Sequence, residues 1–177
     1  MGIYSVMLPD ERIIKATKGS KNLVIIGCGG CANESLAYDN NKAMKLMIDP
    51  NMGHKMPAPD AVTEEANRLK NIIKTENNGI DIVICMGICS MSSDETMNID
   101  KWIDSCTKAD TAVVLSCLSG VKGVKTRLGK NVKVIPGMKT VGTHFSYRII
   151  DNRTDTAYID HDKSSFLNLF ERKKGNR

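Results

Sequence analysis

The chain has 177 residues, a length typical of one domain, and its 41% hydrophobic and 25% charged residues are typical of a soluble globular protein. No segment approaches the ~20 consecutive apolar residues that span a bilayer, so membrane insertion is not expected. The net charge of +5 is small and aromatic residues make up only 5%, which argues against a nucleic-acid-binding protein.

In chain order, helical patterns alternate with short, continuous apolar runs that are typical of buried parallel strands. Helices are predicted at residues 10–18, 33–48, 61–76, 98–108 and 120–128. Strands are predicted at residues 22–26, 80–84, 111–116 and 131–135. Asp60 is the predicted N-cap of the third helix, and a Pro- and Gly-rich loop over residues 49–59 precedes it.

The end of the chain departs from this alternation. Residues 146–160 predict two strands around a turn at residues 151–155, and a short helix is expected over residues 164–170. No repeat or domain boundary is visible in the sequence. We therefore expect a single α/β domain over residues 1–177, with three layers, a mostly parallel sheet and a C-terminal hairpin.

Six cysteines are the most informative feature of the composition. The first residues lack the basic and apolar regions of a secretory signal, so the sequence predicts a cytoplasmic protein with reduced thiols. Metal ligation or redox chemistry is then more plausible than a disulfide framework, although some of the six are expected to be small core residues. They are Cys28, Cys31, Cys85, Cys89, Cys106 and Cys117.

Four of these cysteines lie within five residues after the end of a predicted strand and are grouped by the strand they follow. Cys28 and Cys31 come after the first strand, Cys89 after the second and Cys117 at the end of the third. The carboxyl ends of parallel strands meet at one edge of a sheet, which is where ligand sites form in open α/β folds. The sequence therefore predicts a metal site of four thiolates, suited to either an iron–sulfur cluster or zinc.

Glycines accompany the first two thiols. Gly27, Gly29 and Gly30 permit positive φ, so the chain can wrap around a ligand and present backbone N–H groups to it. The same loop matches the G-x-G-x-x-A dinucleotide fingerprint at Gly27, Gly29 and Ala32. No strand ending in Asp or Glu follows about 20 residues later, however, so tight binding of a nucleotide is not expected.

The remaining candidates are less specific. Cys85 lies four residues before Cys89 and is an alternative ligand. Cys106 falls on the apolar side of a predicted helix and is expected in the core, far from the site. His144 follows the fourth strand and is a candidate hydrogen-bond donor near the metal, but an ordinary hydrogen-bonded histidine is the simpler interpretation.

The cysteine loop, in the segment NLVIIGCGGCA at residues 22–32, resembles the methylenetetrahydrofolate reductase C-terminal domain family. Residues 112–117, AVVLSC, and residues 134–137, VIPG, extend this resemblance, which covers roughly residues 8–145. The resemblance implies a flavodoxin-like domain in which Cys28, Cys31, Cys89 and Cys117 occupy the family's metal-ligand positions.

The resemblance also implies a function. The chain would be an accessory or electron-transfer subunit with one [4Fe–4S] cluster, or alternatively a structural zinc domain that binds a partner protein. The implied partner is a flavin-dependent methylenetetrahydrofolate reductase-like subunit or a corrinoid methyl-transfer protein. The chain departs from the family in its extra segment at residues 49–59, which is a candidate docking element. No cysteine follows Cys117, so the ferredoxin-like extension of some relatives is absent.

Overall fold

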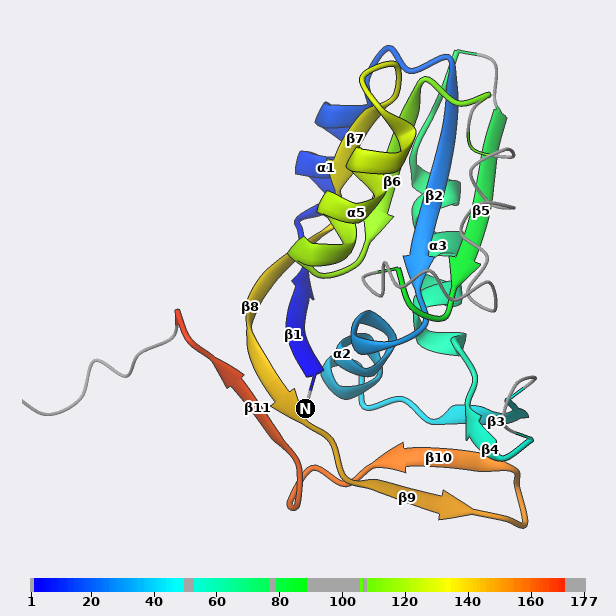
Figure 1. Cartoon of the computed structure of the whole chain (residues 1–177), viewed down its shortest axis with the longest axis vertical. Helices are drawn as coiled ribbons and strands as arrows, with labels where there is room; N and C mark the ends of the chain where they lie inside the picture. The colour runs from blue at the N-terminus through cyan, green and yellow to red at the C-terminus, as the bar shows by residue number, and fades with distance from the viewer. Residues whose placement is uncertain (1, 50–52, 77–78, 89–105, 107, 171–177) are drawn as a thin grey trace, which may run out of the picture.

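A four-stranded parallel sheet lies at the centre of the computed structural model (Figure 1). The structure describes residues 2–49, 53–76, 79–88, 106 and 108–170. The strand order is β5-β2-β6-β7, and all three pairings are parallel. The strands are β2 (Asn22–Cys28), β5 (Gly79–Cys85), β6 (Thr111–Leu115) and β7 (Lys133–Pro136). The four predicted strands are thus confirmed, with ends that differ by one or two residues.

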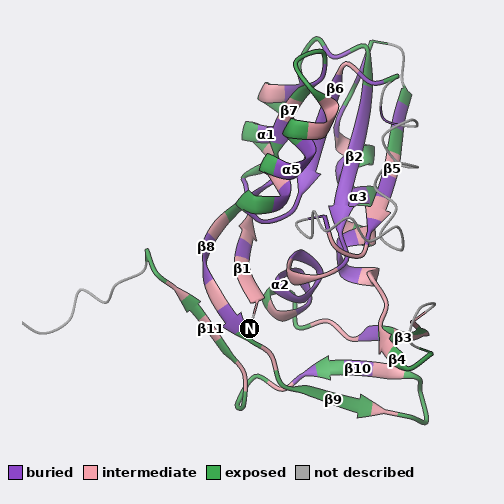
Figure 2. Cartoon of the chain, viewed as in Figure 1, coloured by how far each residue is buried: buried purple, intermediate pink, exposed green. Residues whose placement is uncertain are grey.

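The central strands β2 and β6 are buried almost throughout because helices cover the sheet (Figure 2). In Figure 1, α5 (Leu118–Leu128) lies in front of β6, and α3 (Asp60–Ile72) lies behind β2 and β5. The helix α1 (Asp10–Thr17) packs against β7. All three helices agree with predicted ones, because each carries an apolar face at helical spacing.

The predicted cap of α3 is wrong. Pro59 occupies the N-cap position, and no side chain caps this helix. The carboxylate of Asp60 instead accepts a hydrogen bond of 2.7 Å from the backbone N–H of Lys45. A side chain suited to capping is used here to join α3 to a neighbouring strand.

Seven strands form two antiparallel sheets near the carboxyl ends of the parallel strands (Figure 1). One sheet has the order β1-β8-β11 and consists of β1 (Gly2–Met7), β8 (Met138–Phe145) and β11 (Ser165–Asn168). The other has the order β4-β3-β10-β9 and consists of β3 (Met44–Ile48), β4 (Lys55–Pro57), β9 (Arg148–Asp151) and β10 (Thr156–Ile159). The chain is therefore a mixed α/β protein, and the predicted hairpin is confirmed as β9 and β10.

The helix α2 (Cys31–Asp39) lies between the parallel sheet and these antiparallel sheets. Its residues 32–37 are all buried, because the helix contacts β1, β2 and α3. Its expected continuation to residue 48 is wrong. The chain leaves the helix at Asn40, Asn41 has a positive φ of 48°, and β3 then pairs with β4 and β10.

Three further expectations are corrected or lie, wholly or in part, outside the described residues. Residues 164–170 were expected to be helical, but β11 pairs with β8, and Phe166 stacks on His144 at a centroid distance of 4.7 Å. The predicted loop at residues 49–59 contains β4, and its residues 50–52 lie outside the described part of the chain. The predicted helix at residues 98–108 also lies outside it, apart from Cys106 and Lys108.

Candidate metal centre

Cys28 is the last residue of β2 and is only 3% exposed. It lies in register with Cys85, the last residue of the neighbouring strand β5. Burial raises the pKa of the Cys28 thiol, and hydrogen bonds from the backbone N–H groups of Ile88 and Gly30 oppose this effect. A thiolate at this position would therefore have two backbone donors, as the sequence predicted for the cysteine loop.

Cys31 and Cys117 both act on Cys28. Cys31 is the first residue of α2 and is partly exposed, whereas Cys117 is the N-cap of α5 and is 4% exposed. The charges of both raise the pKa of Cys28, so each of these two thiols lies within electrostatic reach of Cys28. The structure thus gathers three of the four predicted ligands at one edge of the sheet. The fourth, Cys89, lies outside the described residues.

The described thiols do not by themselves form a complete site. Within the described ranges, no three side chains of His, Cys, Asp or Glu are arranged to hold a metal ion. In this part of the chain Cys28, Cys31, Cys85 and Cys117 are free thiols rather than disulfide-bonded.

Two other cysteines lie close to this edge. Burial, together with the charges of Cys28 and Cys106, raises the pKa of Cys85 to about 12. Cys106 is 1% exposed, which agrees with its expected place in the core. The charge of Cys106 contributes to the raised pKa of Cys85, however. Cys106 therefore lies closer to the other thiols than its position in the predicted helix indicated.

The three glycines of the cysteine loop provide close packing rather than unusual backbone angles. The described glycines with positive φ are Gly19, Gly53 and Gly129, so Gly27, Gly29 and Gly30 do not use the positive φ that glycine permits. A Cβ atom at Gly29 would lie 2.8 Å from Met86 Sδ and 3.0 Å from Pro59 Cβ.

The loop and the thiols are also close to other segments. A Cβ atom at Gly30 would lie 3.2 Å from the Met86 carbonyl oxygen and 3.8 Å from Cys28 Sγ. Pro59 ends the segment at residues 49–59, and its approach to Gly29 brings the end of this segment to the cysteine loop.

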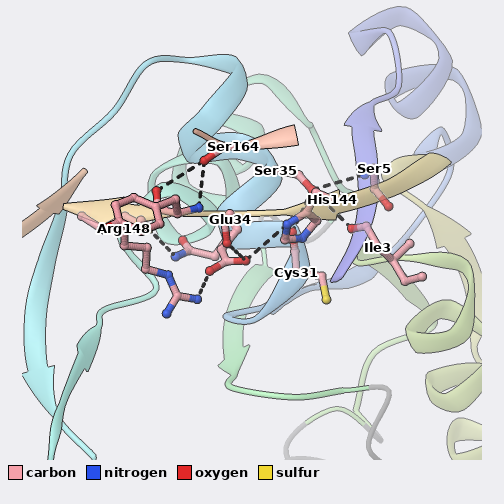
Figure 3. A network of polar contacts seen from close by, with 12 residues as sticks. Ile3, Ser5, Cys31, Glu34, Ser35, His144, Arg148 and Ser164 are labelled. Atoms are coloured by element: carbon pink, nitrogen blue, oxygen red, sulfur yellow. Dashed lines mark hydrogen bonds and ion pairs between the residues drawn. The ribbon is translucent and has the colours of Figure 1, made fainter. Parts of the chain in front are cut away.

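A polar cluster that the sequence did not predict joins α2 to the antiparallel sheets (Figure 3). One carboxylate oxygen of Glu34 accepts a hydrogen bond of 3.0 Å from Ser146 Oγ, and the other pairs with the Arg148 guanidinium. The Glu34 side chain is 12% exposed. The one available signal was an acidic residue inside an otherwise buried stretch of helix.

A serine connects the start of α2 to β1 (Figure 3). Ser35 Oγ donates a hydrogen bond of 2.8 Å to the carbonyl oxygen of Cys31, and it accepts one of 3.2 Å from the backbone N–H of Ser5. Both serines are fully buried. These contacts hold the first turn of α2, and hence the backbone of Cys31, against the strand.

His144 is buried beside this cluster without a hydrogen bond. It is 2% exposed, and neither ring nitrogen has a hydrogen-bond partner. Its Nδ1 lies 3.6 Å from a Glu34 carboxylate oxygen, too far for a hydrogen bond. The expectation of an ordinary hydrogen-bonded histidine is therefore wrong. Burial lowers the pKa of His144.

His144 should therefore make stability depend on pH. Its pKa is lower in the folded chain than the value near 6.5 in the unfolded chain, so the unfolded state binds the proton first as the pH falls. We expect the free energy of unfolding to decrease between pH 7.5 and 5. In His144→Phe, which keeps a ring to stack on Phe166, this decrease should be smaller. Urea unfolding at several pH values measures it, and parallel curves for the two proteins would contradict the prediction.

No family model, no curated protein and no solved structure matches this chain. None of the helices in the described ranges is long and apolar enough to cross a membrane.

Proposed function

We propose that the chain is an accessory or electron-transfer subunit that binds one metal centre through Cys28, Cys31, Cys89 and Cys117. The environment of Cys28 is the observation that supports this most directly. Its thiol accepts hydrogen bonds from two backbone N–H groups, and the charges of Cys31 and Cys117 raise its pKa. N–H donors stabilise thiolate charge, and thiolates are the ligands of both iron–sulfur clusters and structural zinc. The fourth ligand, Cys89, is proposed from its place in the sequence.

A [4Fe–4S] cluster is the first candidate, and it would supply one-electron transfer when bound. The residues of this chain would hold it, and the buried carboxyl edge of β2 and β6 would limit its contact with water. The alternative is a structural zinc that ties together the loops after β2, β5 and β6. The near-complete burial of Cys28 and Cys117 is also compatible with this closed type of site.

The proposed partner follows from the resemblance described above. It is a flavin-dependent methylenetetrahydrofolate reductase-like subunit or a corrinoid methyl-transfer protein, in the cytoplasm. The parallel sheet order β5-β2-β6-β7 supports a flavodoxin-like core, because the same 2-1-3-4 order begins flavodoxin-like sheets. The segment at residues 49–59 remains the proposed docking element near the cysteines, since Pro59 approaches Gly29.

Metal analysis of single cysteine variants tests the ligand set. The chain is purified anaerobically, and metal and acid-labile sulfide are measured. We expect Cys28→Ser, Cys31→Ser, Cys89→Ser and Cys117→Ser to lose the metal, because three thiolates hold a centre far more weakly than four. Cys106→Ser is the matched control, since this thiol is equally buried but is not a proposed ligand. Full metal content in Cys28→Ser and Cys117→Ser would reject the site.

The nature of the metal separates the two candidate functions. A brown protein with broad visible absorption, about four iron and about four sulfide per chain supports the cluster. A colourless protein with about one zinc supports the structural domain. A purified and reconstituted chain that holds neither metal would show that these cysteines act only as small core residues.

A further inference from the structure

Exposed apolar side chains gather at the end of the chain. Among the described residues, eleven large hydrophobic side chains are exposed, and eight of them lie within residues 145–170. Four surround β11 and are called here the β11 patch. They are Phe145, Leu167, Leu169 and Phe170, which are 57%, 56%, 62% and 70% exposed. Such a local concentration is typical of an interaction surface rather than of the scattered apolar residues found on every protein.

The patch borders an open strand edge. β11 pairs with β8 on one side, and in the described part of the chain no strand pairs with its other side (Figure 1). Leu169 N–H donates to the Val141 carbonyl oxygen at 2.8 Å, so the odd-numbered residues of this segment direct their backbone groups at β8. The backbone groups of Phe166 and Asn168 therefore point to the open edge.

This edge lacks the usual protection against pairing. Edge strands are normally protected by proline, by a bulge or by charged side chains on the strand. β11 has the sequence SFLN, with no proline and no charge, and its register with β8 is continuous. An extended segment laid beside it would gain backbone hydrogen bonds from Phe166 and Asn168, and it would cover Leu167.

The charge around the patch favours an acidic occupant. The Lys139 ammonium lies over the Phe170 ring at 5.1 Å from its centroid, and it has no carboxylate partner within the described ranges. In the sequence, residues 171–177, which directly follow Phe170, carry four Lys or Arg against one Glu and so contribute +3 of the net charge of +5. A second copy of the chain would bring like charges together at this edge.

A membrane surface fits the edge less well than a polypeptide. Basic and apolar groups together attract anionic lipid, but lipid cannot satisfy the open backbone N–H and C=O groups of a strand. We propose that the open edge of β11 binds an extended segment of a partner protein, acidic and apolar in sequence, by strand addition. This proposal is independent of the metal centre, because β11 contains none of the proposed ligands.

Selection from a random decapeptide display library on the purified chain tests the proposal. We expect enriched peptides to alternate apolar residues with Asp or Glu. The best peptide is then labelled, and its affinity is measured by fluorescence anisotropy. Leu167→Glu should weaken binding about tenfold or more, because it removes an apolar contact and repels acidic residues. Ile14→Lys, which changes an exposed apolar residue on α1, is the matched control and should not weaken binding.

The backbone contribution has its own test. Asn168→Pro removes an N–H that points to the open edge, and proline is tolerated in edge strands, so this variant should fold and lose binding. A second test uses the wild-type protein with modified peptides. N-methylation of every second residue of the peptide blocks either the N–H groups that face β11 or those that face away from it. The first peptide should lose binding, and the second should bind nearly as well as the unmodified peptide.

Four outcomes would overturn the proposal. The first is that no peptide sequence is enriched. The second is that N-methylation of either set of residues has the same effect. The third is that the chain forms a concentration-dependent dimer that Asn168→Pro abolishes. The fourth is that the chain sediments with vesicles containing anionic lipid, and that Leu167→Glu prevents this without affecting any selected peptide.

Discussion

Gly142→Ala is expected to lower the free energy of unfolding by about 3 kcal/mol, because the new methyl group would fall on the backbone of a neighbouring strand. A Cβ atom at Gly142 would meet the Leu167 carbonyl oxygen and would lie 2.8 Å from its carbonyl carbon and 3.3 Å from the Leu169 nitrogen. These are backbone atoms of the β8–β11 pair, so they cannot move aside as the end of a flexible side chain can. The strand must separate, and the stack of Phe166 on His144 separates with it.

Urea unfolding followed by circular dichroism measures this effect. Gly79→Ala is the matched control, since Gly79 also lies in a strand, and the nearest atom to its added Cβ is Asn22 Oδ1 at 3.3 Å. That side chain can move by a few tenths of an ångström, so the control should cost about 1 kcal/mol or less. Equal unfolding midpoints for Gly142→Ala and the wild type would show that β11 does not pair closely with β8 in solution.

Glu34→Ala is expected to cost about 2 kcal/mol, because Glu34 joins α2 to the antiparallel sheets. The substitution removes the hydrogen bond from Ser146 and the ion pair with Arg148. The two side chains of the ion pair are 12% and 42% exposed, so the loss should lie between that of a surface pair and that of a fully buried pair. Hydrogen exchange should increase in β9 and β10, because β9 loses the ion pair that joins it to α2 and β10 pairs with β9.

Glu65→Ala is a closely matched control for this variant. Glu65 pairs with Arg68 three residues away, and the two side chains are 13% and 45% exposed. The exposures are nearly the same as those of Glu34 and Arg148, but the Glu65–Arg68 pair lies within one helix. The pair of Arg68 with Asp10, which joins α3 to α1, remains in this variant. We expect a loss below about 1 kcal/mol and no change in hydrogen exchange in β9 and β10. If the two variants lose equal stability, the cluster at Glu34 has no special role in joining the sheets.

Local sequence patterns predicted the parallel sheet well. The four apolar runs became β5, β2, β6 and β7, because a strand buried on both faces must be apolar throughout. The same logic placed Cys28, Cys31 and Cys117 at one edge, which agrees with their electrostatic coupling. The ligation of a metal stays a prediction, since Cys89 lies outside the described residues and the described thiols do not form a complete site.

The antiparallel sheets were predicted poorly because their strands are short and pair over long sequence distances. β1 pairs with β8, more than a hundred residues later, and nothing in its first residues indicates that partner. Residues 44–48 and 165–168 also fit a helical pattern locally, and only pairing with β10 and β8 makes them strands. Their tertiary partners outweighed a local preference of at most a few tenths of a kcal/mol per residue.

The sequence by itself determined the parallel core and the edge at which its cysteines lie. Continuous apolar runs indicate buried parallel strands, and residues that follow such strands lie at their shared carboxyl edge. Only the tertiary structure decided the surroundings of that edge. It placed Glu34 between Ser146 and Arg148, buried His144 without a hydrogen bond, and left β11 as an open strand. These features depend on which distant segments meet, and no local pattern of side chains encodes such a meeting.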